Sequence, residues 1–253
     1  MRTLTVLHRD EHLVAVHKPA GLLVHRSALD AHETRFALQL VRDQIGAAVY
    51  PVHRIDKATS GVLMFALTPA VADRCRAAFE AELVEKRYLA IVRGHVPEYG
   101  TIDHPLDRED RAAPTEGARQ PAVTDYRRLA AVELPIAVDR YPSSRYSLVE
   151  LRPRSGRRHQ LRRHLKHIAH PIIGDTTHGH GPHNRMFRER FDSHRLLLVA
   201  VGMALPHPCT GLPLLIETRP DEDFARVAAA LGMRMDADAP ACPARCPPGH
   251  GSM

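Results

Sequence analysis

The sequence predicts an α+β fold, and two observations lead to this prediction. Short apolar runs of strand length recur along the chain and outnumber the segments with helical spacing of apolar residues. The two kinds of segment do not alternate strictly, as they would in a doubly wound α/β fold. The chain has 253 residues, 44% of them hydrophobic and 25% charged, which is enough for one large core. We therefore expect one α+β domain over residues 1–235.

The first predicted element is a buried strand over Leu13–Val16. A helix is expected over Thr34–Ile45, because Gly46 follows as a stop signal. A second buried strand follows over Val62–Leu67. Residues Pro69–Leu83 predict an amphipathic helix, since apolar side chains recur at helical spacing and proline occupies the first turn.

The middle of the chain is expected to be mainly strand. Arg87–Val92, Val123–Leu129 and Tyr146–Leu151 have strand composition, and the polar residues 101–121 predict an exposed loop. Residues 156–169 predict a helix, stopped by the proline that follows.

The last expected elements are two buried strands, over Leu196–Val201 and Leu214–Glu217, and a short helix over Asp221–Leu231. Residues 236–253 are rich in alanine, proline and cysteine and lack periodicity, so we expect a disordered tail.

The charge of the chain favours a polyanionic partner. Its formal net charge is +6 and its pI about 9.4, and each neutralised phosphate releases counterions. Between Leu151 and His167 there are seven lysine and arginine residues and no acid. A solvated basic face is the alternative interpretation of this run. No apolar run approaches the roughly 20 residues that cross a bilayer, and the chain start lacks a secretory pattern, so we expect a cytoplasmic protein.

Three blocks carry residues suited to chemistry. His53–Leu63 places the carboxylate of Asp56 between two cations, just before a Thr-Ser-Gly turn and an apolar run. Lys86–Tyr88 and Gly156–Arg162 follow downstream. These blocks, in this order, resemble the motifs of the RluA-type pseudouridine synthases. The resemblance implies a bent, mixed, mainly antiparallel sheet with flanking helices and a central RNA-binding cleft. It also implies that no N-terminal S4 domain precedes the catalytic domain.

The candidate partner for Asp56 follows from helix geometry. Burial alone would raise the pKa of a carboxyl group, and a neighbouring guanidinium reverses that tendency and can bind it in a bidentate manner. On a helix, Arg162 lies beside the apolar stripe of Leu161, Leu165 and Ile168, where it can reach inward. The resemblance puts the family's carboxylate-pairing arginine at Arg162. A structural buried ion pair is the alternative interpretation.

The resemblance assigns further roles. Asp56 is the catalytic carboxylate, and Tyr88 lies beneath the target base, where its ring can stack on uracil and its hydroxyl can help to remove the C5 proton. Arg54 occupies the gap left by the flipped nucleotide. His53 is expected to orient the motif loop. With Arg54, the expected substrate-binding residues are His53, Arg157, His159 and Gln160. The reaction has no redox change and needs no external energy, so no cofactor is expected.

The RNA target and two other classes of function stay open. Residues 41–46, 140–146 and 178–191 resemble a tRNA-modifying branch of the family, which implies tRNA as partner and uridine 65 as target. A 23S rRNA-specific or dual-specificity enzyme is the alternative, as is a non-catalytic RNA-binding protein. A metal-dependent hydrolase could use His178, His180 and His183, but no cysteine or acid accompanies them at a characteristic spacing. We therefore expect no metal site, and no obligate protein partner is evident.

Overall fold

The computed structural model of the chain describes residues 3–25, 34–107 and 119–235. The strands are β1 (Thr5–Arg9), β2 (Leu13–Lys18), β3 (Tyr50–Pro51), β4 (Ser60–Ala66), β5 (Glu85–Arg93), β6 (Tyr99–Asp103), β7 (Val123–Leu134), β8 (Ser144–Pro153), β9 (Leu198–Pro206) and β10 (Pro213–Glu217). The helices are α1 (Ala37–Ile45), α2 (Pro69–Glu80), α3 (Gln160–His167), α4 (Gly181–Phe191) and α5 (Glu222–Ala230). The expected disordered tail, with Cys242 and Cys246, lies outside the described residues.

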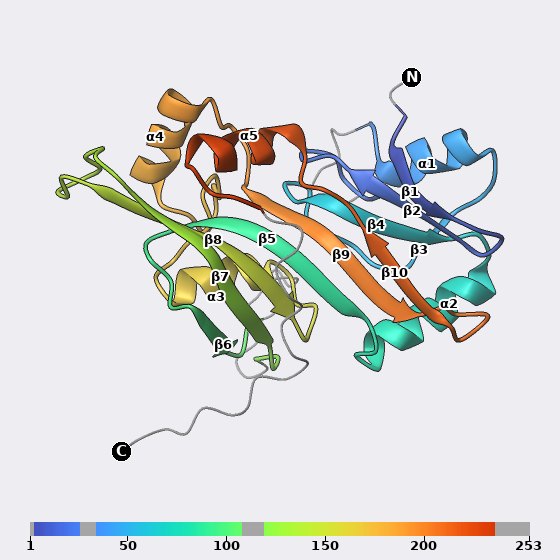
Figure 1. Cartoon of the computed structure of the whole chain (residues 1–253). Coiled ribbons are helices and arrows are strands. Elements are labelled where there is room, and N and C mark those ends of the chain that lie inside the picture. The colour runs from blue at the N-terminus through green and yellow to red at the C-terminus, as the bar shows by residue number, and fades with distance from the viewer. Residues whose placement is uncertain (1–2, 26–33, 108–118, 236–253) are drawn as a thin grey trace, which may run out of the picture.

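The strands form one mixed sheet with helices on both faces (Figure 1). Its order is β1-β2-β4-β9-β5-β8-β7-β6, with β10 added to β9 and β3 to β4. Within the described residues, β4 and β9 are the parallel pair of named strands, and the other pairs are antiparallel. The predicted α+β class and the mainly antiparallel sheet are therefore confirmed. No helix in these residues is long and apolar enough to cross a membrane.

The parallel contact in the centre of the sheet depends on Gly61. Its φ of +110° is rarely adopted by other residues, and a Cβ atom there would lie 2.0 Å from the carbonyl oxygen of Ala200. The glycine that follows the Thr-Ser pair of the first motif thus lets β4 approach β9. This contact joins the N-terminal and C-terminal parts of the sheet at the base of the motif.

Every predicted helix and strand is present, but several ends differ. The first helix begins at Ala37 and not at Thr34, because Phe36 is extended and forms a bridge with Leu23. The second ends at Glu80, so that Leu83 is 56% exposed and does not continue the apolar stripe. The sequence prediction missed β1, β3, β6 and α4, and β6 occupies the start of the segment predicted as a loop.

The predicted helix over residues 156–169 is shorter than expected and begins at Gln160. His159 before it is in the left-handed conformation, with a φ of 52°. The side-chain oxygen of Gln160 accepts hydrogen bonds from the backbone N–H of Arg157, at 3.0 Å, and from the hydroxyl of Ser155, at 2.8 Å. These local bonds stabilise a turn in place of a further helical turn.

Alternate residues of β5 show which helices cover which face of the sheet. Leu89 and Ile91 belong to a core cluster with side chains of α4 and α5. Ala90 and Val92 point the other way, into a cluster with Leu161 of α3. In Figure 1, α4 and α5 accordingly lie above the sheet and α3 lies below it. The sheet therefore separates α3 from α4.

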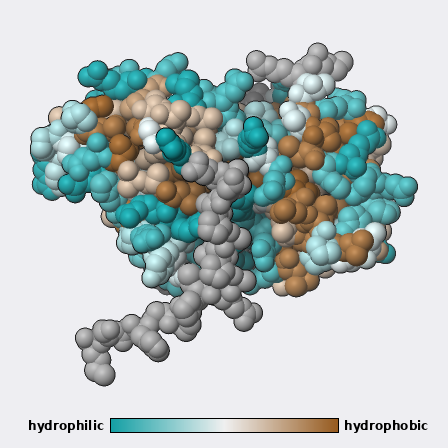
Figure 2. Space-filling view, viewed as in Figure 1, coloured by the Kyte–Doolittle hydropathy of each residue, from teal (hydrophilic) through white to brown (hydrophobic). Residues whose placement is uncertain are grey.

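An apolar area lies over β9 and β10 in the view of Figure 2. Two of the exposed large hydrophobic side chains belong to this hairpin, Leu212 at 67% and Leu215 at 63%. The other side of β10 is buried through Ile216, as expected for a strand with alternating faces.

Candidate active site

A cavity of about 480 Å³ is lined by residues of all three sequence motifs. The first motif contributes residues 53–56 and Thr59, the second Lys86 and Tyr88, and the third Gly156, Arg157 and residues 159–162. All eight predicted site residues line it, namely His53, Arg54, Asp56, Tyr88, Arg157, His159, Gln160 and Arg162. The fold thus brings together the residues that the sequence singled out.

Asp56 lies in a turn immediately before β4. The backbone N–H of Thr59 donates to the carbonyl of Asp56 at 3.1 Å, and the Asp56 side chain is 24% exposed. The neighbouring carbonyl of Lys57 accepts from Gly21 N, at 2.8 Å, and from the Lys18 ammonium, at 3.1 Å. The backbone on either side of the carboxylate is therefore fixed by hydrogen bonds.

The ammonium of Lys18 lies inside the protein. It donates to three carbonyl oxygens, of Pro19 at 2.9 Å, Leu22 at 2.7 Å and Lys57 at 3.1 Å, and the residue is fully buried. Burial, and then the positive charge of Arg195, lower the pKa of Lys18 to about 7. Lys18 thereby connects the N-terminal Lys-Pro segment to the loop that carries Asp56.

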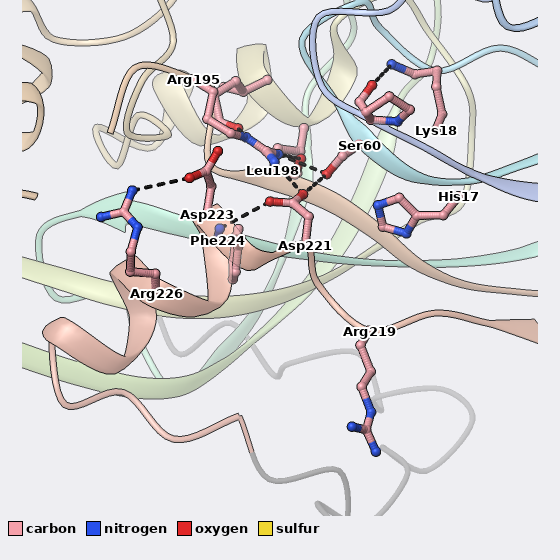
Figure 3. A network of polar contacts seen from close by, with 12 residues as sticks. His17, Lys18, Ser60, Arg195, Leu198, Arg219, Asp221, Asp223, Phe224 and Arg226 are labelled. Carbon is pink, nitrogen blue, oxygen red and sulfur yellow. Dashed lines mark hydrogen bonds and ion pairs between the residues drawn. The ribbon is translucent and has the colours of Figure 1, made fainter. Parts of the chain in front are cut away.

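A second polar network fixes the other end of the motif (Figure 3). The hydroxyl of Ser60 donates to Asp221 Oδ2 at 2.5 Å and accepts from Arg195 at 2.9 Å, and Arg195 also pairs with Asp221. The other oxygen of Asp221 accepts from the backbone N–H of Phe224 and so caps α5. The start of β4 is therefore bound to the first turn of the C-terminal helix.

Arg162 does not form the bidentate pair with Asp56 that we predicted. Its Nε and Nη2 atoms donate to the two oxygens of Asp175, at 2.7 and 2.9 Å, and only Nη1 reaches Asp56, at 3.3 Å. Asp175, whose side chain is 1% exposed, occupies the edge of the planar guanidinium formed by Nε and Nη2. Arg162 is thus held by Asp175 and presents its remaining nitrogen to the less buried carboxylate.

Asp175 is the functional residue that the sequence prediction missed. It is the first acidic residue after Glu150, at the end of the basic run, and this is the one signal that could have indicated it. Its Oδ1 atom also accepts from the backbone N–H groups of Thr177 and His178, at 2.9 and 2.8 Å. The loop that follows Asp175 is therefore ordered by the same carboxylate that holds Arg162.

This loop reaches back to the cavity through a pair of histidines. His178 Nε2 lies 3.3 Å from His159 Nδ1, and the two rings meet edge to face. The amide of Asn184 strengthens the loop, since it donates to the Asp175 carbonyl and accepts from Gly174 N, each at 2.8 Å. His159, whose backbone is left-handed, is consequently held by His178 in a loop that Asn184 stabilises.

Tyr88 lies on β5, next to a register shift in its pairing with β9. Burial, and then the negative charge of Asp56, raise its pKa well above the ordinary value. The hydroxyl is therefore a neutral phenol at physiological pH. It can stack, donate or accept a hydrogen bond, but it is not an ionised base.

His53 forms part of the cavity wall. Its Nε2 accepts from the backbone N–H of Met64 at 3.0 Å, and its ring stacks on Phe79 with a centroid distance of 5.2 Å. Burial, and then the positive charge of Lys86, lower its pKa to about 3, so that the ring is neutral. These contacts join the motif loop to β4 and α2, as a loop-orienting residue requires.

The remaining predicted residues differ in how free they are to bind substrate. Arg54 is exposed at the cavity, whereas Gln160 is buried. In addition to the bonds to its oxygen, Gln160 Nε2 donates to Val123 O at 3.0 Å and to Thr124 Oγ1 at 3.1 Å. Because its amide is engaged on both sides, Gln160 supports the turn before α3. Arg157 donates from Nε to the carbonyl of Pro121 at 3.1 Å.

The basic run is partly neutralised by acids of β8 and β7. Arg152 pairs with Glu150 at 3.0 Å, and Arg154 forms a bidentate pair with Asp125, at 2.7 and 2.9 Å. The local sequence shows an uninterrupted series of cations, but Glu150 lies on the same strand as Arg152, and the pairing of β7 with β8 places Asp125 beside Arg154. The arginines of the basic run therefore differ in how far a neighbouring carboxylate compensates their positive charge.

Comparison with known proteins supports the motif resemblance. Residues 12–167 match the RNA pseudouridylate synthase family. The chain is 50% identical over 234 residues to tRNA pseudouridine synthase C of Vibrio cholerae, covering 90% of this chain and 96% of that protein. It is 49% identical over 234 residues to the protein of the same name from Yersinia pestis, covering 90% and 91%.

Two solved human structures share the fold at 26% sequence identity. RNA Pseudouridylate Synthase Domain Containing 1 superimposes with a TM-score of 0.67, covering 87% of this chain and 84% of that one. RNA Pseudouridylate Synthase Domain Containing 4 gives a TM-score of 0.68, covering 91% and 94%. This chain therefore belongs to the RNA pseudouridylate synthase family, and it is an isomerase that converts uridine in RNA to pseudouridine.

Proposed function

We propose that the substrate of this enzyme is tRNA and that the modified base is uridine 65. Support for tRNA comes from the relatives named tRNA pseudouridine synthase C, which match this chain at about half of all positions over nearly their whole length. Uridine 65 rests on the resemblance of segments outside the catalytic motifs to the tRNA-modifying branch of the family.

The observation that carries the chemistry is a chain of hydrogen bonds at the cavity wall, in which Arg162 connects Asp56 to Asp175. Pseudouridine formation breaks the N1–C1′ bond of uridine, turns the base and joins C5 to C1′. In our proposal Asp56 is the catalytic carboxylate. Arg162 orients it, and Asp175 fixes the guanidinium. Because Arg162 forms its bidentate pair with Asp175 and only one bond with Asp56 Oδ2, the other oxygen of Asp56 stays available for the substrate.

Tyr88 and Arg54 complete the proposed site. The target base has to leave its stack to reach a carboxylate inside a cavity, and this is base flipping. The Tyr88 ring is suited to stack on the flipped uracil. Its neutral hydroxyl can take up the C5 proton only if it passes its own proton to a stronger base. Arg54, exposed at the cavity, is suited to fill the space that the nucleotide leaves.

The RNA is expected on the α3 face of the sheet. The cavity opens beside α3, whereas α4 packs on the opposite face, with Arg185, Arg188 and Arg190 exposed there. Most of the segment 178–191 is therefore separated from the cavity by the sheet, and only His178, through His159, contacts the cavity wall. For this reason we do not assign base recognition to α4.

The test compares pseudouridine maps of tRNA and rRNA from cells with the gene, without it, and with Asp56→Asn in its place. We expect one tRNA uridine, at position 65, to lose the modification in the second and third strains. Purified Asp56→Asn should bind tRNA almost normally, because affinity rests mainly on phosphate contacts. Loss in 23S rRNA with tRNA unaffected would refute the substrate and leave the reaction intact. Turnover above a few per cent by Asp56→Asn would refute the catalytic role.

A further inference from the structure

A group of potential metal ligands lies on the opposite face of the sheet from the cavity. Asp139, His180 and His183 each offer one ligand atom, and these atoms lie within 4.8 Å of one another. His180 is the N-cap of α4 and His183 is in its first turn. Asp139 comes from the turn of the β7–β8 hairpin, where Val138 and Tyr141 form a bridge. From these three residues we infer a site for a divalent transition metal, with Zn²⁺ as the favoured ion.

The ligand types and distances suit zinc. Imidazole nitrogens and a carboxylate oxygen bind Zn²⁺ at about 2.0–2.2 Å, which places tetrahedral ligands about 3.3 Å apart. Asp139 Oδ2 is already 3.6 Å from His180 Nε2, and the two histidine rings are 5.1 Å apart at 63°. Ligand atoms that now lie within 4.8 Å of one another would approach by up to about 1.5 Å when the ion binds. The side chains of His180 and Asp139 are 34% and 40% exposed, so that water can supply a fourth ligand.

The buried ligand is oriented by a hydrogen bond. His183 is 5% exposed, and its Nδ1 lies 2.7 Å from the hydroxyl of Tyr146, which is itself buried. In the tautomer in which His183 Nδ1–H donates to the Tyr146 hydroxyl, the other ring nitrogen, Nε2, can bind metal.

One polar atom at this site lacks a protein partner. His180 Nδ1 is buried and has no hydrogen-bond partner among the described residues. The imidazole is thus incompletely satisfied by its surroundings, although Asp139 is beside its other nitrogen. The positive charge of Arg93 acts against cation binding at His183.

The inferred metal would cross-link the β7–β8 hairpin to α4. Both segments belong to the regions that the catalytic motifs leave unexplained, and Tyr146 already packs edge to face against Phe187 of α4. The site is remote from Asp56 and lies across the sheet from it, so its role is structural. Sequence spacing alone gave the histidines without an acid, and the hairpin supplies the missing ligand.

The experiment uses the full chain without an affinity tag, stripped with a chelator and titrated with Zn²⁺ alone by calorimetry. We expect about one equivalent to bind, with Kd weakened at least tenfold in Asp139→Asn and in His180→Gln. Zn²⁺ should raise the Tm of the wild type and not of these variants. His194→Gln is the matched control, because His194 and Asp192 form a similar exposed pair, at 2.9 Å, with no third ligand in the described residues.

Two results would overturn the inference. One is that the wild-type chain binds no equivalent of Zn²⁺ more tightly than exposed surface histidines do. The other is one equivalent whose affinity is unchanged in both Asp139→Asn and His180→Gln, since the metal would then lie elsewhere. Circular dichroism checks that the variants are folded. If His180→Gln fails this check, the exposed Asp139→Asn decides alone.

Discussion

Arg162 is bound by Asp175 through two short hydrogen bonds, at 2.7 and 2.9 Å, and touches Asp56 through one longer contact of 3.3 Å. The guanidinium is therefore positioned before any substrate arrives. A carboxylate that had to hold its own arginine in a bidentate pair would have both oxygens engaged. In this arrangement a second, more buried carboxylate fixes the arginine, and Asp56 stays accessible from the cavity.

Arg162→Lys should be strongly impaired although it keeps the charge. Lysine cannot reproduce the planar fork, so it cannot satisfy Asp175 and reach Asp56 together. Breaking a buried pair costs about 3 kcal/mol or more, and we expect kcat to fall on the order of 100-fold. Single-turnover assays on tRNA measure this loss. Arg163→Lys, one residue along the helix, is the control and should be mild, and equal activity of the two variants would contradict the argument.

Asp175→Asn tests the residue that only the structure revealed. The substitution leaves the buried guanidinium without its paired anion, so we expect about 3 kcal/mol or more of lost stability in urea unfolding. At saturating tRNA kcat should also fall, while the Kd for tRNA stays near normal. Asp125→Asn removes the exposed bidentate partner of Arg154 and should cost about 1 kcal/mol or less. A stability loss at Asp175 without any effect on kcat would limit this residue to a purely structural role.

The salt dependence of tRNA binding should distinguish the arginines of the basic run. Arg157→Gln removes a cation at the cavity and should flatten the log–log salt slope by about 0.7–0.9. Arg154→Gln should change it less, because Asp125 already compensates that charge. Arg188→Gln on α4, exposed on the opposite face, is the control and should leave the slope unchanged. A slope for Arg188→Gln as flat as that of Arg157→Gln would mean that the RNA covers the other face.

Stability should fall in acid partly because of His53. Its pKa is about 3 in the folded protein, below the ordinary 6.5, so below pH 6.5 the unfolded chain binds a proton that the folded chain does not. The contribution of His53 to the free energy of unfolding is therefore fully present above pH 6.5 and is lost as pH falls towards 3, by at most about 1.4 kcal/mol per pH unit.

His53→Gln keeps an acceptor for Met64 N and should give a shallower loss of stability between pH 6.5 and 4. Urea midpoints across this range measure it, with His194→Gln as the exposed control. Parallel pH profiles of His53→Gln and wild type would refute the assignment.

The sequence by itself determined the class of elements and singled out candidate residues that line one cavity in the structure. Apolar periodicity is a local property, so it predicted strands at β2, β4, β5, β8 and β9 and the helices α2 and α5. Asp56, Tyr88 and Arg162 were each marked by neighbours within a few positions. Helix ends were predicted less well, because side-chain bonds such as those of Gln160 compete with helical ones and depend on residues that spacing does not reveal.

Only the tertiary structure decided which charges meet. Asp175 and Arg162, Asp125 and Arg154, and Asp139 and His180 are brought together by sheet register or by loop closure. None of these pairs follows from local periodicity, since each needs the mutual placement of two segments. Sequence spacing alone therefore could not assign Asp175 to Arg162 or Asp139 to the histidines. Burial strengthens the contact between Arg162 and Asp175, because a charge removed from water must be matched by a partner that the fold supplies.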